Sequence, residues 1–304
     1  MGRYILIRFF QGIIALFVIS IVIFLLARLS GDPTSLLLPI NATPADREHI
    51  VQYLGLDKPL PVQYQIFITQ ALQGDLGESI RVRVPVTQLI GERIPNSLKL
   101  AGAALCIIFI IGIPLGVMAA YKKGRFMDKL ARLVAGLGQS APHFWVGLIL
   151  MEIFAVRLHL LPVAGMGTWQ HYIMPGFVMA WFEMAAIIRL LRRSMLDSLD
   201  SEYIRMARIK GVSERAIVWK HAFRNSLLAP VSFGGVYAAM LITCAIVTET
   251  VFAWPGFGRL AYDAILFRDF PLMQGVVLTT AVIVITVNLV TDILYAYLDP
   301  RIRY

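Results

Sequence analysis

The sequence predicts an all-α integral membrane protein with six transmembrane helices. Hydrophobic residues make up 58% of the 304 positions, charged residues only 15%, and the mean hydropathy is +0.71. This balance is typical of a chain that lies largely in lipid. A bilayer core about 30 Å thick requires about 20 apolar residues per helix. Six segments are long enough, near residues 9–29, 98–121, 134–156, 172–191, 228–252 and 273–297.

The first apolar segment is predicted to be a retained membrane anchor over residues 1–29. Arg3 and Arg8 precede it, as basic residues precede the core of a secretory signal. Its apolar run is longer than the roughly 7–15 residues of a signal core, however, and Ala-Arg-Leu at 27–29 is a poor cleavage site. Cleavage is therefore not expected.

Lysine and arginine gather on one predicted side of the membrane. They lie at both termini, between residues 122 and 132, and between residues 189 and 224. Short loops rich in basic residues stay in the cytoplasm, and six spans place both termini on the same side. The termini and the loop after residue 200 are therefore predicted to be cytoplasmic.

The composition argues against several other functions. The net charge of +9 lies in loops where the topology demands it, so nucleic-acid binding is not indicated. Cys106 and Cys244 lie in apolar spans without pairing or metal spacing, and are expected to be small buried apolar residues. The chain has no phosphate-binding loop, HExxH or GxSxG motif, which predicts neither an enzyme nor ATP hydrolysis by this chain itself.

Residues 30–96 form a long connection between the first two spans. Turn formers such as Gly-Asp-Pro at 31–33 alternate with a helical stretch, PADREHIVQYLGL, that opens at Pro44 after a capping Thr43. Connections of this length usually have a function of their own. A small folded cap outside the cytoplasm is predicted, and a simple bridge between the spans remains an alternative.

A polar, basic stretch at 202–224, EYIRMARIKGVSERAIVWKHAFR, follows the fourth span. Asp200 or Ser201 is placed to cap a first helix, Gly211 to end it, and Ser213 to start a second helix that reaches residue 225. Two interpretations are open at this point: a surface presented to a soluble partner, or interfacial basic residues that contact anionic lipid.

Several stretches together resemble a known family. They are GDP at 31–33, LGLDKPLPVQY at 54–64, GDLGES at 74–79, TETVFAWPGFGR at 248–259 and DPRIRY at 299–304. With Ala207 four residues before Gly211, the whole chain resembles permease subunits of ATP-binding-cassette importers of the peptide, nickel and opine group (the dipeptide and oligopeptide permease B type). The resemblance implies a type I ABC importer permease fold in a bacterial inner membrane, with an anchor at 1–29, an extracytoplasmic cap at 30–91, a permease domain at 92–298 and a cytoplasmic tail at 299–304.

The resemblance also implies that the basic loop docks on an ATPase subunit. The implied coupling residues are Glu202, Tyr203, Arg205, Ala207, Arg208, Gly211, Arg215, Arg224 and Asn225. The general importer motif has a glutamate and two alanines where this chain has Arg205, Met206 and Ala207, and many members have a proline in place of Arg224; peptide-type permeases are similar to this chain in both respects. The implied partners are a second homologous permease, two ATPases that bind ATP and Mg, an extracytoplasmic binding protein and membrane lipid. No cofactor is expected in this chain, and no metal site.

Four carboxylates fall within or near the apolar spans: Glu152, Glu183, Glu249 and Asp292. Such groups are functional candidates, so a proton-coupled secondary transporter is an alternative. For Glu152 and Glu183 the ordinary alternative is local pairing with Arg157 and Arg189, or snorkelling to the interface, and Asp292 is expected to reach the interface.

Glu249 precedes a predicted helix break at Trp254-Pro255-Gly256. A broken helix at membrane depth is tolerated where it lines a cavity, so an outer gate is predicted. Its residues are Glu249, Phe252, Trp254, Pro255, Gly256 and Gly258. The alternative is an interfacial aromatic belt of Phe252, Trp254 and Phe257.

The substrate implied by the resemblance is a dipeptide or oligopeptide. Nickel chelates, glutathione and opines remain alternatives, because related permeases handle them. A scaffold without a transport role is a third interpretation, and it predicts no substrate-dependent stimulation of an ATPase.

Overall fold

A computed structural model of the chain describes residues 2–29, 43, 51, 57–227, 230 and 245–298. Within this part the protein is helical, apart from turns and one isolated β-bridge between Glu78 and Pro85. The chain divides into two compact units. The first comprises residues 1–95 and 256–304, and the second, residues 96–255, is inserted between them in the sequence.

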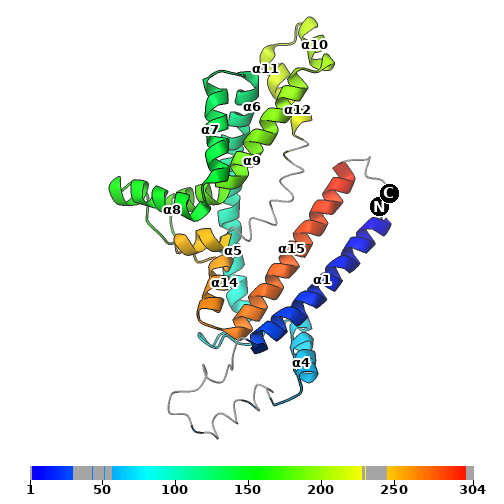
Figure 1. The fold of residues 1–304 in the computed structure, drawn as a ribbon, viewed down its shortest axis with the longest axis vertical. Helices are drawn as coiled ribbons and strands as arrows, with labels where there is room; N and C mark the ends of the chain where they lie inside the picture. Colours follow the sequence, from blue (N-terminus) through cyan, green and yellow to red (C-terminus); the bar gives the residue numbers. More distant parts are fainter. Residues whose placement is uncertain are drawn as a thin grey trace. The chain divides into compact units, whose positions relative to one another are not determined.

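The first unit contains two long helices that lie side by side, α1 (Gly2–Leu29) and α15 (Phe270–Leu298) (Figure 1). Arg8 of α1 pairs with Asp292 of α15, Nε to Oδ2, at 3.2 Å. Asp292 therefore has a partner within the chain, in addition to any contact with the interface. A shorter helix, α4 (Leu60–Leu72), packs on α1 through Tyr64 and Phe67, whose rings lie 5.5 and 5.8 Å from the ring of Phe24.

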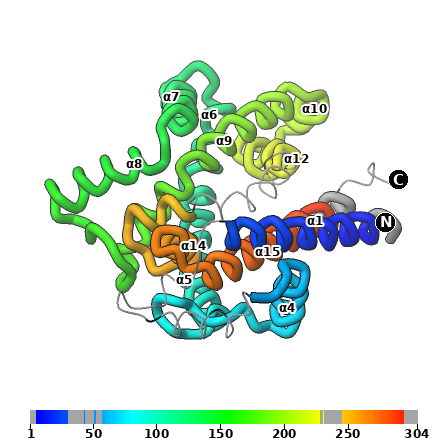
Figure 2. The backbone as a smooth tube through the Cα atoms, turned by 60° about the horizontal axis from the view of Figure 1, so that its bottom comes forward, coloured from blue at the N-terminus to red at the C-terminus, as the bar shows by residue number. Residues whose placement is uncertain are grey.

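The remaining core of the first unit lies where α14 (Phe257–Leu266) packs against α15 and against the first turns of α5 (Val86–Ile107) (Figure 2). Its buried side chains are Val86, Ile90, Phe257, Leu260, Ala264, Leu272 and Val276. The α5 helix contains Pro95 and continues into the second unit.

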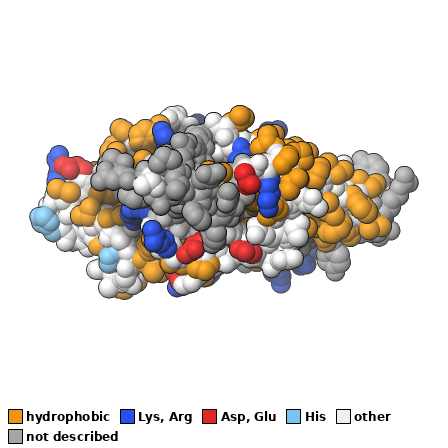
Figure 3. All heavy atoms as spheres, turned by 90° about the horizontal axis from the view of Figure 1, so that it is seen from below, with side chains coloured by type: hydrophobic (Ala, Val, Ile, Leu, Met, Phe, Trp, Pro, Cys, Tyr) orange, Lys and Arg blue, Asp and Glu red, His pale blue; other side chains and the backbone are white. Residues whose placement is uncertain are grey.

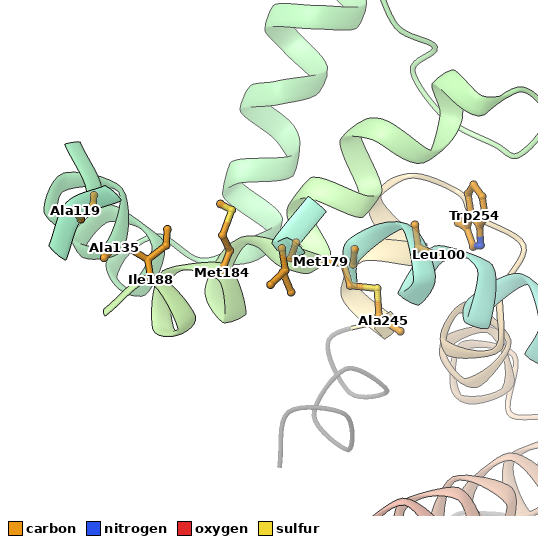
Figure 4. Close-up of a cluster of buried hydrophobic side chains, with 12 residues drawn as sticks. Leu100, Ala119, Ala135, Met179, Met184, Ile188, Ala245 and Trp254 are labelled. Atoms are coloured by element: carbon orange, nitrogen blue, oxygen red, sulfur yellow. The ribbon is translucent and has the colours of Figure 1, made fainter. Parts of the chain in front are cut away.

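In the second unit, α5 runs through a π-helical turn, η1 (Ile108–Gly112), into α6 (Ile113–Tyr121). Two further helices, α7 (Phe126–Ser140) and α9 (Ile173–Leu199), pack against α6 and against each other. Met179, Met184 and Ile188 of α9 meet the alanines of α6 and α7 in one buried cluster (Figure 4). Small residues let the helix backbones approach closely, as is common between membrane helices.

Four described helices are long and apolar enough to cross a membrane. They are Ile5–Leu29, Val86–Tyr121, Trp169–Leu199, which includes the 3₁₀ turn η3 (Trp169–Tyr172), and Phe270–Ile293. They coincide with the first, second, fourth and sixth predicted spans. Hydrophobic side chains gather on the right-hand part of Figure 3, where Figure 2 places α1 and α15. The predicted fifth span at 228–252 lies largely outside the described residues, as do Cys244, the helical stretch from Pro44 and the tail at 299–304.

The predicted third span at 134–156 is not one continuous helix. The chain bends by 112° between α7 and a second segment made of α8 (His143–Leu150) and the π-helical η2 (Met151–Arg157). Pro142 explains the break, because proline lacks an N–H and forces the residue before it out of the helical region. Ala141 accordingly has φ −92° and ψ 125°. The pair forms either one broken span or a re-entrant loop.

The expected burial of Cys106 is also wrong. Cys106 is exposed, as are Leu105 beside it and Phe109 in η1. In a membrane span, such exposed side chains meet lipid or another subunit rather than water.

The contact between α7 and α9 supports a paired prediction. A Cβ on Gly138 would overlap the Cβ of Ala185 and lie 3.2 Å from the carbonyl oxygen of Trp181, whereas a Cβ on Gly136 would meet nothing within 4 Å. We expect Gly138→Ala to lower stability by about 1–3 kcal/mol through overpacking, and Gly136→Ala to leave stability unchanged or raise it by up to about 1 kcal/mol. Thermal unfolding in detergent measures both, and equal midpoints would contradict the close packing.

Candidate functional site

The loop that follows α9 forms two short helical segments, as the sequence predicts. These are α10 (Glu202–Ile209) and a second segment composed of α11 (Glu214–Ala216), η4 (Ile217–Ala222) and α12 (Phe223–Ser226). Ser201 and Ser213 occupy the N-cap positions without a side-chain capping bond. The hydroxyl of Ser201 instead donates to the carbonyl oxygen of Ser198. We call residues 201–226 the α10–α12 loop.

Gly211 makes the turn between the two segments. Its φ is +75°, in the left-handed region that favours glycine. The Gly211 N–H donates to the Arg208 carbonyl at 3.0 Å, and the Val212 N–H donates to the Ala207 carbonyl at 3.1 Å. These two bonds define a Schellman motif, with Ala207 and Val212 packed on the same core below it.

The α10–α12 loop is anchored on the second unit through its inner face. Ile204 is fully buried in a cluster that includes Met195 and Leu199 of α9 and Ile217 and Val218 of η4. The cluster also contains Val117 and Ala120 of α6. A displacement of α10 would therefore be transmitted by direct packing to the ends of α6 and α9.

The outer face of the loop presents most of the predicted coupling residues. Ala207 is half-buried, and the other eight are exposed: Glu202, Tyr203, Arg205, Arg208, Gly211, Arg215, Arg224 and Asn225. Arg205 pairs with Glu202 at 2.7 Å, and Arg208 pairs with Glu214 across the glycine turn at 2.9 Å. Exposed pairs of this kind contribute at most about 1 kcal/mol each. They leave the face polar and open to a partner.

Two further residues of this face are missing from the sequence prediction. Met206 and Ile209 are 53% and 78% exposed, and with Tyr203 they form an apolar stripe along α10. The signal was present in the sequence, because these positions are three residues apart while buried Ile204 faces the other way. Exposed apolar stripes rimmed by charge mark interaction surfaces.

The second candidate region is the break after residue 251. The described helix at 245–251 ends in another Schellman motif, with Ala253 at φ +49°, followed by Trp254 and Pro255. Trp254 is fully buried, its indole N–H donates to the carbonyl oxygen of Asn96 at 3.1 Å, and its ring lies edge-on to Tyr172 at 4.7 Å. The predicted break is confirmed at this position.

The alternative of an aromatic belt is wrong for these residues. Phe252 is buried in the second unit beside Val146 and Met174, and Phe257 is buried in the core of the first unit. Aromatic side chains of an interfacial belt would instead extend to the surface. The packing of Phe252 and Trp254 makes the break part of the second unit's core.

Glu249 is fully buried one turn before the break. The Ser97 hydroxyl donates to its Oε1 at 2.5 Å, and the neighbouring Asn96 amide donates to the carbonyl oxygen of Pro255 at 2.9 Å. The predicted gate residues Gly256 and Gly258 belong to the first unit, where Gly256 precedes α14 and Gly258 is buried in its first turn. The six predicted gate residues are thus divided between the two units.

The other candidate carboxylates differ in their environments. Glu152 pairs with Arg157 at 2.9 Å on an exposed surface, as expected. Glu183 does not pair with Arg189, because six residues along α9 place buried Glu183 and exposed Arg189 on different faces. Neither carboxylate oxygen of Glu183 has a hydrogen-bond partner in the part of the chain that the structure describes. Among the described residues, no group of three or more His, Cys, Asp or Glu side chains is placed to hold a metal ion.

Family models match nearly the whole chain. Residues 112–304 match the family described as binding-protein-dependent transport system inner membrane component. Residues 1–101 match the N-terminal region of binding-protein-dependent transport system membrane components.

Individual relatives agree with the family models. The chain is 39% identical to the glutathione transport system permease protein GsiC of Escherichia coli O6:H1 and to GsiC of Salmonella typhimurium. It is 38% identical to GsiC of Shigella dysenteriae. Each alignment has 305 residues and covers the full length of both proteins. Among solved structures, an inward-facing MetNI methionine ABC transporter has a similar fold, with a TM-score of 0.57 and 17% identity over 70% of this chain and 97% of that one. The chain therefore belongs to the family of inner-membrane components of binding-protein-dependent transport systems, and it is a multi-pass permease subunit of an ABC importer rather than an enzyme.

Proposed function

We propose that this permease forms one half of the translocation pathway for short peptides. The observation that supports this proposal most is the full-length identity of 39% to permeases named for glutathione transport. Dipeptides and oligopeptides remain the first substrate class, and glutathione, itself a tripeptide, is the alternative that the relatives' names favour. Nickel chelates and opines stay further alternatives.

The complete importer would contain a second homologous permease, two ATPase subunits and an extracytoplasmic binding protein. Family membership supports these partners in general terms. In this proposal the ATPases, and not this chain, bind ATP and Mg. The positions of the basic residues support an orientation with both termini and the α10–α12 loop in the cytoplasm.

The α10–α12 loop is our candidate for the surface that docks on an ATPase subunit. Its inner face is fixed by Ile204, and its outer face combines the apolar stripe of Tyr203, Met206 and Ile209 with exposed arginines. Apolar and arginine side chains together are typical of protein interfaces. Closure of two ATPases around ATP would displace this loop, and the packing below it would pass the displacement to α6 and α9.

The substrate assignment is tested with purified complete importer in liposomes. We expect ATP-dependent transport of a labelled dipeptide or of labelled glutathione across the liposome membrane when the binding protein is supplied on the extracytoplasmic side of the importer. Accumulation of nickel chelate alone would overturn the peptide assignment. Uptake driven by a proton gradient without ATP would support a secondary transporter.

Glu249 is our candidate for a gate carboxylate next to the helix break. We expect Glu249→Ala to reduce transport about tenfold, because it removes the buried carboxylate that accepts the hydrogen bond of the half-buried Ser97 hydroxyl, a loss of about 1–3 kcal/mol. Glu249→Gln retains an acceptor oxygen and should keep most of the activity. Uptake assays read transport, and co-purification of the ATPases controls for assembly. Normal uptake by Glu249→Ala would argue against the gate.

A further inference from the structure

A surface of the first unit is built from two segments far apart in the sequence. Asp269, at the start of α15, is buried and accepts hydrogen bonds from the Ser79 hydroxyl at 2.5 Å and from the backbone N–H groups of Ile80 at 3.2 Å and Arg81 at 3.3 Å. It also accepts a bond from the Leu272 N–H at 3.3 Å. One carboxylate thus fixes the turn at 79–83 to the corner between α14 and α15.

Three exposed arginines project from these fixed turns: Arg81, Arg83 and Arg268. The guanidinium of Arg81 lies 3.4 Å from the centre of the Phe267 ring, which holds it in place. Within the part of the chain that the structure describes, none of the three forms an ion pair. We call these three residues the arginine rim. Asp75 and Glu78 are exposed in the preceding turn, so the surface carries some negative charge as well.

Two residues of the arginine rim, Arg268 and Arg83, have a left-handed backbone conformation that glycine would adopt without strain. The α14 helix ends in a Schellman motif, in which the Arg268 N–H donates to the Ile265 carbonyl at 3.1 Å and the Asp269 N–H donates to the Ala264 carbonyl at 2.9 Å. Arg268 therefore stands at φ +53°, the position that Gly211 fills after α10.

Arg83 also has φ +53°. A left-handed conformation costs a non-glycine residue roughly 1–2 kcal/mol. Strained positions of this kind are concentrated at functional sites.

We propose that the arginine rim is a docking surface for an acidic face of the importer's extracytoplasmic binding protein. The inference rests on the proposed orientation, which places residues 79–83 and 265–269 outside the cytoplasm. The family depends on a binding protein, and that protein must dock on this side of the membrane. The arginines stand on turns that Asp269 fixes, have no ion-pair partner among the described residues, and lie beside exposed Val82, Leu266 and Phe267. They offer complementary charge with apolar contact, as interface anchors do.

The test measures binding of the importer's own binding protein to the complete importer in liposomes, with stimulation of the ATPase as a second readout. We expect Arg83→Glu to raise the half-maximal binding-protein concentration about tenfold or more, since a reversed charge replaces attraction by repulsion. Lys58→Glu makes the same charge change at another exposed position of the first unit and should have no effect. ATPase activity without binding protein should be the same in both variants.

The variant Arg268→Gly tests whether a loss of docking can occur without a loss of stability. It removes the side chain and relieves the backbone, so thermal stability should stay equal or rise while docking weakens. Unchanged docking of the binding protein on both Arg83→Glu and Arg268→Gly would overturn the proposal. It would also be overturned if these variants bound anionic lipid vesicles more weakly but bound the binding protein normally. Failure of the wild-type importer to bind its binding protein would overturn it as well. A wild-type importer that binds its binding protein but imports no peptide would instead refute the substrate assignment and leave the arginine rim supported.

Discussion

Gly211→Asp is expected to abolish ATP-driven transport while the permease remains folded. A Cβ at position 211 meets nothing within 4 Å in its own chain, so the new carboxylate would project from the turn toward the proposed ATPase. An unpaired charge forced into a docked interface costs several kcal/mol, which corresponds to a loss of affinity of about a hundredfold or more. Co-purification of the ATPases and binding-protein-stimulated ATPase activity both measure the effect.

The chain contains a matched control for this substitution. Gly74 ends α4 in the same Schellman motif, with φ +83°, an N–H bond to Ala71 at 3.1 Å and an Asp75 N–H bond to Gln70 at 2.9 Å, and a Cβ there also meets nothing within 4 Å. Gly74→Asp therefore has the same backbone cost of about 1–2 kcal/mol. If both variants lose transport equally, the backbone rather than docking is responsible. Normal ATPase binding by Gly211→Asp would refute the coupling role of the α10–α12 loop.

Asp128→Ala is expected to cause the largest loss of stability. Asp128 is buried at the start of α7, where it accepts hydrogen bonds from the Gly124 N–H at 2.8 Å and from Arg192 Nε of α9 at 2.6 Å, with Arg132 at 3.6 Å. Removing one partner of a fully buried pair costs about 3–5 kcal/mol. Arg192 is partly exposed, so we expect about 2–3 kcal/mol, since water stabilises the freed guanidinium in part.

The exposed pair between Glu152 and Arg157 is the control for Asp128. Its atoms are also close, at 2.9 Å, but both side chains are largely exposed. Glu152→Ala should therefore change stability by less than about 1 kcal/mol. The midpoints of thermal unfolding in detergent measure both variants. Equal midpoints would show that the Asp128 network does not hold α7 to α9.

The spans that sequence reasoning located correctly are those in which apolar length alone decides the structure. The α1, α9 and α15 helices are uninterrupted, so a window of about 20 apolar residues finds them. The bend before His143 was missed because hydropathy continues through Pro142 and only backbone sterics change there. Cys106 was misplaced for a related reason: within a span, apolar composition does not tell which face meets a neighbouring helix and which meets lipid.

The candidate sites were predictable only in part, because their partners are distant in the sequence. The turn at Gly211 was predicted correctly, because it follows from a single glycine, whereas the coupling role of the residues around it stays a prediction. Glu249 could be predicted as a candidate because it is a carboxylate within an apolar span. Nothing near it in the sequence indicates that Ser97 donates a hydrogen bond to it. Asp128 lies in the sequence among the basic residues at 122–132, and nothing there indicates that folding buries it against Arg192. The domain limits at 30, 92 and 299 stay predictions.

The hydrogen bonds of Asn96 have a consequence for the modular use of this chain. Asn96 and Pro255 are the first and last residues of the second unit, 159 positions apart, and the side chain of one bonds to the backbone of the other. An inserted domain whose first and last residues lie close together can be exchanged without distorting the parts of the chain on either side of it. Chimeras that exchange residues 96–255 between relatives should therefore fold if they keep the asparagine, the proline and the tryptophan before it. Such chimeras would combine the α10–α12 loop of one importer with the arginine rim of another.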